Sequence, residues 1–141
     1  MKILVSACLL GTPCRYDGKS KPNQEVILLK DKYELIPVCP ECLGGLETPR
    51  LPAEIKGDKV IRIDGYDVTS NYTKGAEKTL EISKANGIEI AILKSKSPSC
   101  SSKQIYDGTY NKRLIDGKGI TTRLLEKNNI KVIDESELGK L

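Results

Sequence analysis

Four short, predominantly apolar segments constrain the fold of this chain most strongly. They are rich in Ile, Leu and Val and predict buried strands at residues 3–7, 34–38, 89–94 and 131–134. Strands that are apolar on both sides occur in parallel sheets whose two faces are covered by helices. The sequence therefore predicts an α/β protein with a three-layer α/β/α Rossmann-like fold, a mostly parallel sheet and a small β-hairpin insertion.

The segments between the strands supply the expected helices. Residues 23–32 have Asn23 as a candidate cap and carry apolar side chains on one face. Residues 72–86 have an inner stripe of small and apolar side chains, and Gly87 follows them as a typical helix end. A third helix is expected at residues 120–127.

Turn-forming residues predict the remaining connections. Residues 59–63 and 66–69 are joined by an Asp-Gly dipeptide and have the pattern of a β-hairpin. Residues 40–52 are rich in Gly and Pro, so we expect a loop there. A second irregular segment, which contains Gly and Tyr, is expected at residues 103–117.

Length and charge indicate one domain and a small-molecule partner. A chain of 141 residues can bury a real core, and we expect residues 1–141 to form a single domain. The net charge of +4 is spread along the chain, which favours a lysine-rich surface over a nucleic-acid footprint. No apolar run is long enough for a signal peptide or a membrane span. We therefore expect a cytoplasmic protein without a membrane partner.

The chain contains no histidine, which removes several mechanisms at once. Ser-His-Asp hydrolysis, His-ligated catalytic zinc and proton transfer by imidazole all require that side chain. Proton transfer by this protein must use Asp, Glu, Cys, Lys, Tyr, a hydroxyl group or water.

Three of the five cysteines lie just beyond the expected strands. Cys8, Cys39 and Cys100 each follow one, and the carboxyl ends of parallel strands meet at one edge of the sheet. Convergent thiolates without imidazole favour a soft metal, above all an iron–sulfur cluster, or zinc. Inert or redox-active thiols are the third interpretation that the residues alone leave open.

The Cys39-x-x-Cys42 pair is a weak signal by itself. A thioredoxin-type centre needs a helix after the pair, and the expected loop offers none. A zinc ribbon needs a second closely spaced pair, which the chain lacks. The odd number of cysteines also argues against an extracellular disulfide framework.

The residues around the cysteines narrow the choice. They form recognisable motifs: Ser6-Ala7-Cys8-Leu9-Leu10-Gly11, Cys14-Arg15-Tyr16-Asp17-Gly18, Val38-Cys39-Pro40-Glu41, Gly44-Gly45-Leu46 with Pro49-Arg50, and Leu93-Lys94 followed by Ser97-Pro98-Ser99-Cys100. In combination, these motifs resemble the family of small prokaryotic proteins that includes the [4Fe-4S]-dependent 2-thiouracil desulfurase. The resemblance covers essentially the whole chain.

The resemblance implies a cofactor, a reaction and a set of site residues. A [4Fe-4S] cluster would be held by Cys8, Cys39 and Cys100, leaving one iron open for the sulfur of a small thiolated heterocycle. Glu41 and Ser97 would form the catalytic pair of a hydrolytic, non-redox desulfuration that releases sulfide. The sequence departs from the family pattern at one place, where the glycine expected after the last motif is Ser101.

Each assignment has a structural alternative. Glu41 can be a solvated loop carboxylate, and Ser97 can simply form a turn before Pro98. Cys14 suits a small buried side chain, and Cys42 ranks fourth as a ligand. Four further charged residues can line a substrate pocket or form structural ion pairs: Arg15, Asp17, Arg50 and Glu54.

Two other functions compete with the desulfurase. One is a non-enzymatic domain that binds zinc or an iron–sulfur cluster for stability or for sensing. The other is a module that binds thiolated bases within RNA, which the dispersed charge supports poorly. The sequence leaves the physiological substrate and the oligomeric state open.

Overall fold

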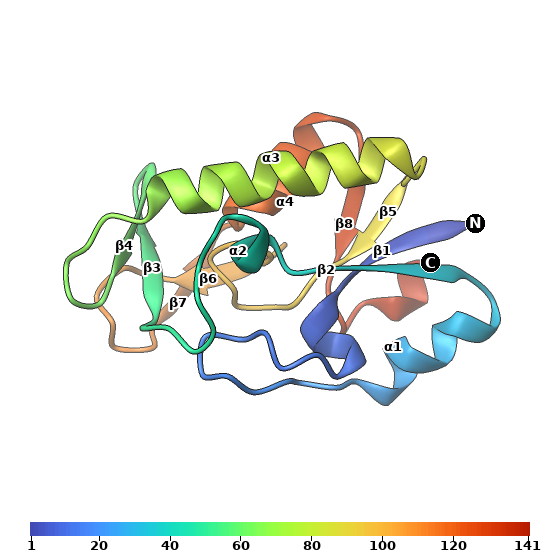
Figure 1. Ribbon diagram of the computed structural model, residues 1–141, viewed down its shortest axis with the longest axis horizontal. Coiled ribbons are helices and arrows are strands. Elements are labelled where there is room, and N and C mark those ends of the chain that lie inside the picture. Colours follow the sequence, from blue (N-terminus) through green and yellow to red (C-terminus); the bar gives the residue numbers. More distant parts are fainter.

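The computed structural model describes residues 1–141 and is built around a four-stranded parallel sheet (Figure 1). Its strands are β1 (Lys2–Ser6), β2 (Glu34–Val38), β5 (Ile90–Ile92) and β8 (Lys131–Ile133), in the order β2-β1-β5-β8. The chain adds β2 on one side of β1 and later adds β5 on the other side. The sheet therefore has a topological switch point between β1 and β5, where α/β proteins bind their ligands.

Helices cover both faces of this sheet, which confirms the three-layer prediction. Helices α3 (Thr69–Ala85) and α4 (Ile120–Lys127) lie on one face, and α1 (Gln24–Leu28) lies on the other (Figure 1). Short 3-10 turns accompany α1: η1 (Ala7–Leu10), η2 (Leu29–Asp31) and η3 (Leu138–Lys140). Side chains of β1 alternate between two fully buried clusters, because successive residues of a strand point to opposite faces. None of the helices is both long and apolar enough to cross a membrane.

The β-hairpin insertion exists and its first predicted strand, at 59–63, is confirmed, but the predicted partner strand is wrong. β3 (Ala53–Lys56) pairs in antiparallel fashion with β4 (Lys59–Arg62), whereas the expected partner at 66–69 forms one isolated bridge. The side chains of Asp67 and Thr69 explain the difference. The Asp67 carboxylate accepts the N–H of Thr69 at 2.8 Å, and the Thr69 hydroxyl accepts the N–H of Val60 at 2.8 Å. These bonds start α3 at the position where a second strand was expected.

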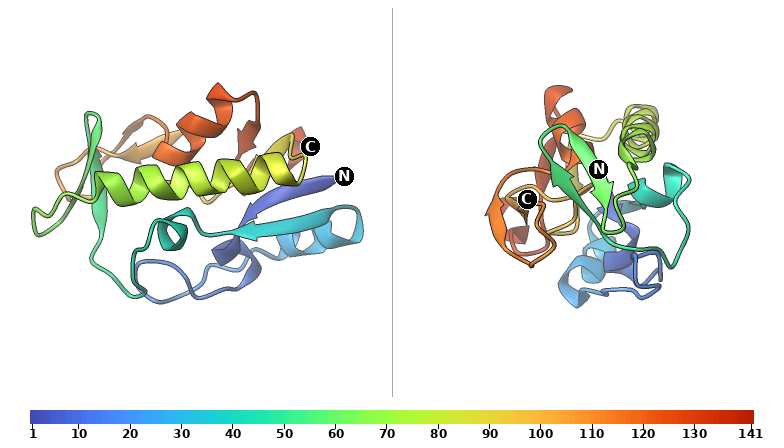
Figure 2. Two further views of the ribbon diagram at one scale, coloured as in Figure 1. Left: turned by 45° about the horizontal axis from the view of Figure 1, so that its top comes forward. Right: turned by 90° about the vertical axis from the view of Figure 1, so that its left-hand side faces the viewer.

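The expected irregular segment at 103–117 contains a second antiparallel pair of strands. Its strands are β6 (Gln104–Tyr106) and β7 (Leu114–Asp116). Ile105 of β6 shares a small buried cluster with the β3–β4 hairpin, so both insertions lie together at one end of the molecule (Figure 2).

The segment after β2 also differs from the prediction, since residues 40–43 form the short helix α2 (Pro40–Leu43) instead of a loop. Pro40 suits the first turn of a helix, where its missing N–H costs nothing. Two glycines allow α2 to approach α3 closely. A Cβ at Gly44 would lie 2.0 Å from the Asn71 carbonyl oxygen, and one at Gly75 would lie 2.0 Å from the Pro40 carbonyl oxygen. In the Gly44-Gly45 pair, Gly44 therefore allows close helix packing and Gly45, with its positive φ, forms the turn.

This close approach gives a test of the fold. We expect Gly75→Ala to lower the free energy of unfolding by about 2 kcal/mol, although alanine is the better helix former. The added methyl group would push α2 away from α3. Chemical denaturation of the purified variant measures the effect.

Gly139→Ala is the matched control, because a Cβ at Gly139 meets no atom within 4 Å. Its free energy of unfolding should change by less than about 0.5 kcal/mol. Equal stability of the two variants would show that the α2–α3 contact is not tight.

Candidate metal centre

A cavity of about 210 Å³ lies beyond the carboxyl ends of the central strands. Four thiol-bearing residues from separate segments line it: Cys8, Cys14, Cys39 and Cys100. The structure thus brings the three predicted ligands, Cys8, Cys39 and Cys100, to one cavity together with Cys14. Cys42 does not line this cavity. The predicted catalytic residues Glu41 and Ser97 both line it.

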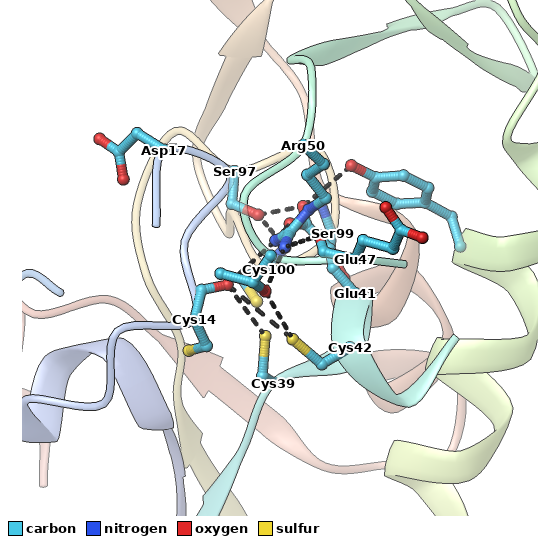
Figure 3. A network of polar contacts seen from close by, with 12 residues as sticks. Cys14, Asp17, Cys39, Glu41, Cys42, Glu47, Arg50, Ser97, Ser99 and Cys100 are labelled. Carbon is cyan, nitrogen blue, oxygen red and sulfur yellow. Dashed lines mark hydrogen bonds and ion pairs between the residues drawn. The ribbon is translucent and has the colours of Figure 1, made fainter. Parts of the chain in front are cut away.

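The backbone carbonyl of Cys14 organises one side of the site (Figure 3). Cys39 and Cys42 direct their Sγ atoms to this oxygen at 3.7 and 3.9 Å, and Arg50 donates to it from Nη2 at 3.1 Å. The Cys42 thiol also contacts the Thr48 hydroxyl at 3.5 Å. One carbonyl group therefore ties the turn around Cys14 to the start of α2.

Cys39 is the N-cap residue of α2 and Cys42 lies within this helix, so the expectation that the CxxC pair lies in a loop is wrong. A low-pKa redox thiol nevertheless does not result. The contact with Cys14 and burial raise the pKa of Cys39, and burial raises the pKa of Cys42. Thioredoxin-type chemistry requires the opposite shift.

The turn before Cys100 is built around the Ser97 hydroxyl. Its oxygen accepts the backbone N–H groups of Ser99 and Cys100, each at 3.1 Å. This is the turn that a Ser-Pro segment favours. Because both backbone groups are donors, the Ser97 hydroxyl keeps its own hydrogen to donate, and the Cys100 thiol is within its reach.

Ser101 occupies the position where the resemblance leads us to expect glycine. Its φ is not positive, so a side chain is tolerated there without backbone strain. Ser101 is buried and its hydroxyl donates to the carbonyl oxygen of Gln104. The substitution therefore leaves the turn that carries Cys100 intact.

The thiols of Cys14 and Cys100 are neutral at physiological pH. Burial raises the pKa of Cys100 to about 12, although the hydroxyl of Ser6 lowers it. The contact with Cys39 lowers the pKa of Cys14, but its contact with Cys8 and burial outweigh this and raise the value to about 11. Such thiols become thiolates when a metal cation replaces the proton.

Glu41 is held by two neighbours and is not a solvated loop carboxylate. Its side chain is 14% exposed, and one oxygen forms an ion pair with Arg50. The other oxygen accepts a hydrogen bond of 2.9 Å from the Tyr72 hydroxyl. Burial and the adjacent Glu41 raise the pKa of Tyr72, which keeps its hydroxyl protonated as a donor. These contacts fix where the carboxylate points.

The other charged candidates mostly brace loops. Glu54 accepts the backbone N–H groups of Gly108 and Tyr110 at 2.9 and 3.1 Å, and Arg15 pairs with Asp17 at 3.7 Å. Three of the four candidates, Arg15, Arg50 and Glu54, also line the cavity, so they combine both interpretations. Arg50 in addition pairs with Glu41.

Sequence reasoning missed two residues of the site, Tyr72 and Ser6. Tyr72 was expected only at the start of a helix, and no local motif signals that its hydroxyl reaches Glu41, 31 residues away. Ser6 lies within the first cysteine motif, but its contact with Cys100 spans 94 residues and depends on strand order.

Comparisons with known proteins show the family of this chain. A family model described as 2-thiouracil desulfurase matches residues 3–137. The chain belongs to the 2-thiouracil desulfurase family. It is 42% identical to the uncharacterized protein YbbK of Bacillus subtilis (strain 168), over 99% of each chain. A solved structure described as the [4Fe-4S]-dependent thiouracil desulfidase TudS matches with a TM-score of 0.95 and 45% identity, covering 99% of this chain and 94% of that one.

The raised pKa values predict how the thiols of metal-free protein react. Alkylation of Cys14 and Cys100 should accelerate about tenfold per pH unit between about pH 7 and about pH 10, because only the thiolate reacts. Because their pKa values are about 11 and about 12, the alkylation rate should level off only above this pH range. Peptide mass spectrometry after timed treatment with iodoacetamide gives the rate for each cysteine.

Unfolded protein is the control for this experiment. In urea, the alkylation rate of all five thiols should level off at a pH just above the ordinary thiol pKa of about 8.5. A plateau near that value in the folded protein would contradict the raised pKa values.

Proposed function

We propose that this protein removes sulfur from a small thiolated heterocycle, such as 2-thiouracil, by a hydrolytic, non-redox reaction. A [4Fe-4S] cluster held by Cys8, Cys39 and Cys100 would be its cofactor, with Glu41 and Ser97 as the catalytic pair. One observation carries the proposal: three thiols that are distant in the sequence line one cavity together with Glu41 and Ser97. Membership of the 2-thiouracil desulfurase family supports it.

The donor set fits an iron–sulfur cluster. The lining thiols are buried or half-buried, and no imidazole is available. No three Cys, Asp or Glu side chains are grouped so as to hold one ion, which a tetrahedral zinc site requires. When bound, the cluster would supply a thiophilic Lewis acid for the C=S group, at the iron that has no protein thiolate.

In this proposal, Glu41 accepts a proton from the attacking water. It lines the same cavity as the three proposed ligands, and, in addition to burial, its charge is near enough to raise the pKa of one of them, Cys100. Arg50 and Tyr72 each bond one carboxylate oxygen, and every carboxylate oxygen keeps a further lone pair. A base held in a fixed orientation needs no reorganisation when the water approaches.

In this proposal, Ser97 acts as the hydrogen-bond donor to the substrate. Because its oxygen accepts two backbone N–H groups, its O–H can point to the sulfur or a ring nitrogen of the substrate. Hydrogen bonding there stabilises the negative charge that develops as the C–S bond breaks.

The net reaction balances without a redox partner. The thiocarbonyl compound and water give the carbonyl compound and hydrogen sulfide, with the C–S bond broken and a C–O bond formed. Glu41 takes one proton from water and passes it to the departing sulfur, and the second proton of water reaches the sulfur as the new hydroxyl group becomes the carbonyl. No electron donor or acceptor is consumed.

We further propose that residues 1–141 act as one thiouracil-desulfurase-like domain in the cytoplasm. The family match across residues 3–137 supports the single domain. A cytoplasmic location keeps thiols reduced for cluster assembly. The small cavity and the dispersed charge favour a free small molecule over a nucleic acid as the partner.

Cysteine variants test the proposed cofactor. Serine replacements of Cys8, Cys39 and Cys100 should each abolish retention of the cluster, because each removes one of three ligands. Cys14→Ser and Cys42→Ser are the matched controls and should keep about four irons per chain. Iron and acid-labile sulfide are measured on protein purified without oxygen. Stoichiometric zinc instead of iron, or loss of iron only in Cys14→Ser, would contradict the assignment.

A second set of variants tests the catalytic role of Glu41. Glu41→Gln should keep the cluster and lower turnover of 2-thiouracil roughly 100- to 10,000-fold, the usual contribution of a general base. Tyr72→Phe should cause a smaller loss, since it removes only an orienting hydrogen bond. Turnover is followed by the ultraviolet absorption change as uracil forms.

Tyr33→Phe is the control for Tyr72, because Tyr33 packs on the α1 side of the sheet and does not line the cavity. It should leave turnover unchanged. Full activity of Glu41→Gln would remove Glu41 from the mechanism.

A further inference from the structure

Ser6 lies at the switch point of the sheet and joins the proposed metal centre to the strands. It is the last residue of β1, it is 2% exposed, and it lines the cavity. Its Oγ lies 3.6 Å from the Sγ of Cys100 and 2.9 Å from the backbone nitrogen of Lys94. The proposed function uses Cys100 and gives Ser6 no role.

The two contacts fix the direction of the hydroxyl hydrogen. A backbone N–H can only donate, so the Ser6 oxygen must accept from Lys94. The remaining contact of the hydroxyl is the sulfur of Cys100, and the O–H therefore donates to that sulfur.

The position of Lys94 holds this arrangement in place. Leu93, the residue before it, donates its N–H to the carbonyl oxygen of Ile133 at 2.9 Å. The Lys94 ammonium pairs with Glu135 at 2.9 Å, and both side chains are 17% exposed. The N–H that orients Ser6 thus belongs to a well-anchored stretch of backbone.

We propose that Ser6 is a positioning residue that hydrogen-bonds the Cys100 sulfur and tunes the metal group which that sulfur holds. This inference rests on the proposed function. A hydrogen bond to a ligand sulfur withdraws electron density from the metal, which raises its reduction potential and strengthens it as a Lewis acid. Stronger Lewis acidity is what polarisation of a C=S bond needs.

The bond also makes the proposed ligands unequal. The Cys39 sulfur lies 3.7 Å from the carbonyl oxygen of Cys14, which cannot donate to a thiolate, and no hydroxyl group contacts it. Cys100 has a hydroxyl donor instead. Ser6 therefore weakens electron donation from the Cys100 sulfur to the metal group. The contact between Ser6 and Cys100 exists because β1 and β5 are neighbours in the sheet.

Ser6→Ala tests the proposal in anaerobically prepared protein that carries its cluster. The midpoint potential should fall, so that the ratio of reduced to oxidised cluster at a fixed potential changes roughly two- to tenfold, the range expected for one hydrogen bond. Iron content should stay at the wild-type level. Redox titration followed by visible absorption and EPR gives the potential.

Ser99→Ala is the matched control. Ser99 is 1% exposed and adjacent to Cys100, but its hydroxyl bonds Thr121 at 2.8 Å and not the sulfur. Its potential should equal that of the wild type. An equal shift in Ser99→Ala and Ser6→Ala would overturn the proposal, because it would show a general effect of packing.

Wild-type protein gives an independent readout should Ser6→Ala fail to fold. Exchange into deuterium oxide should shift the Fe–S(Cys) stretching bands in resonance Raman spectra, and the absence of any shift would overturn the proposal. If the protein binds the cluster but Ser6→Ala leaves its midpoint potential unchanged, this inference alone is overturned. Protein that takes up no iron overturns the proposed function and this inference with it.

Discussion

The order of the parallel strands is the constraint on which the rest of this structure depends. With β1 between β2 and β5, the carboxyl ends of three strands meet at one edge. Cys8 and Cys39 follow β1 and β2 directly, and Cys100 follows β5 after a tight turn. Each sulfur is placed by a backbone element that is buried in the core. A site assembled on such elements needs little further ordering when a ligand binds.

Polar contacts complete what the strands begin. The Cys14 carbonyl gathers Cys39, Cys42 and Arg50, and Arg50 in turn fixes Glu41. Buried groups of this kind are costly without partners, so their mutual bonds restrict the site to one arrangement. The close α2–α3 contact fixes the helix that carries Glu41. Stability and chemistry therefore depend on the same few contacts.

Local patterns predicted the parts of the structure that local physics decides. Apolar periodicity indicated all four sheet strands, and Asn23 caps α1 as expected. The hairpin partner was wrong because Asp67 and Thr69 start α3, a choice made by side-chain bonds rather than by strand propensity. Helix α2 was missed because glycines such as Gly44 are typical of loops. In the structure, Gly44 instead allows close contact between α2 and α3.

The candidate site was accessible to sequence reasoning only in part. Position after a strand indicated Cys8, Cys39 and Cys100, and motif resemblance indicated Glu41 and Ser97. The partners of these residues were not predictable. Tyr72 and Ser6 act across long stretches of sequence, and such contacts exist only once the strand order and the helix packing are set.

The most direct test of the account is anomalous diffraction at the iron edge from crystals grown without oxygen. Strong iron density in the cavity, within bonding distance of the sulfurs of Cys8, Cys39 and Cys100, is the predicted result. Iron density bonded to Cys14 or Cys42 in place of one of these three would contradict it. An anomalous signal at the zinc edge alone would also contradict it.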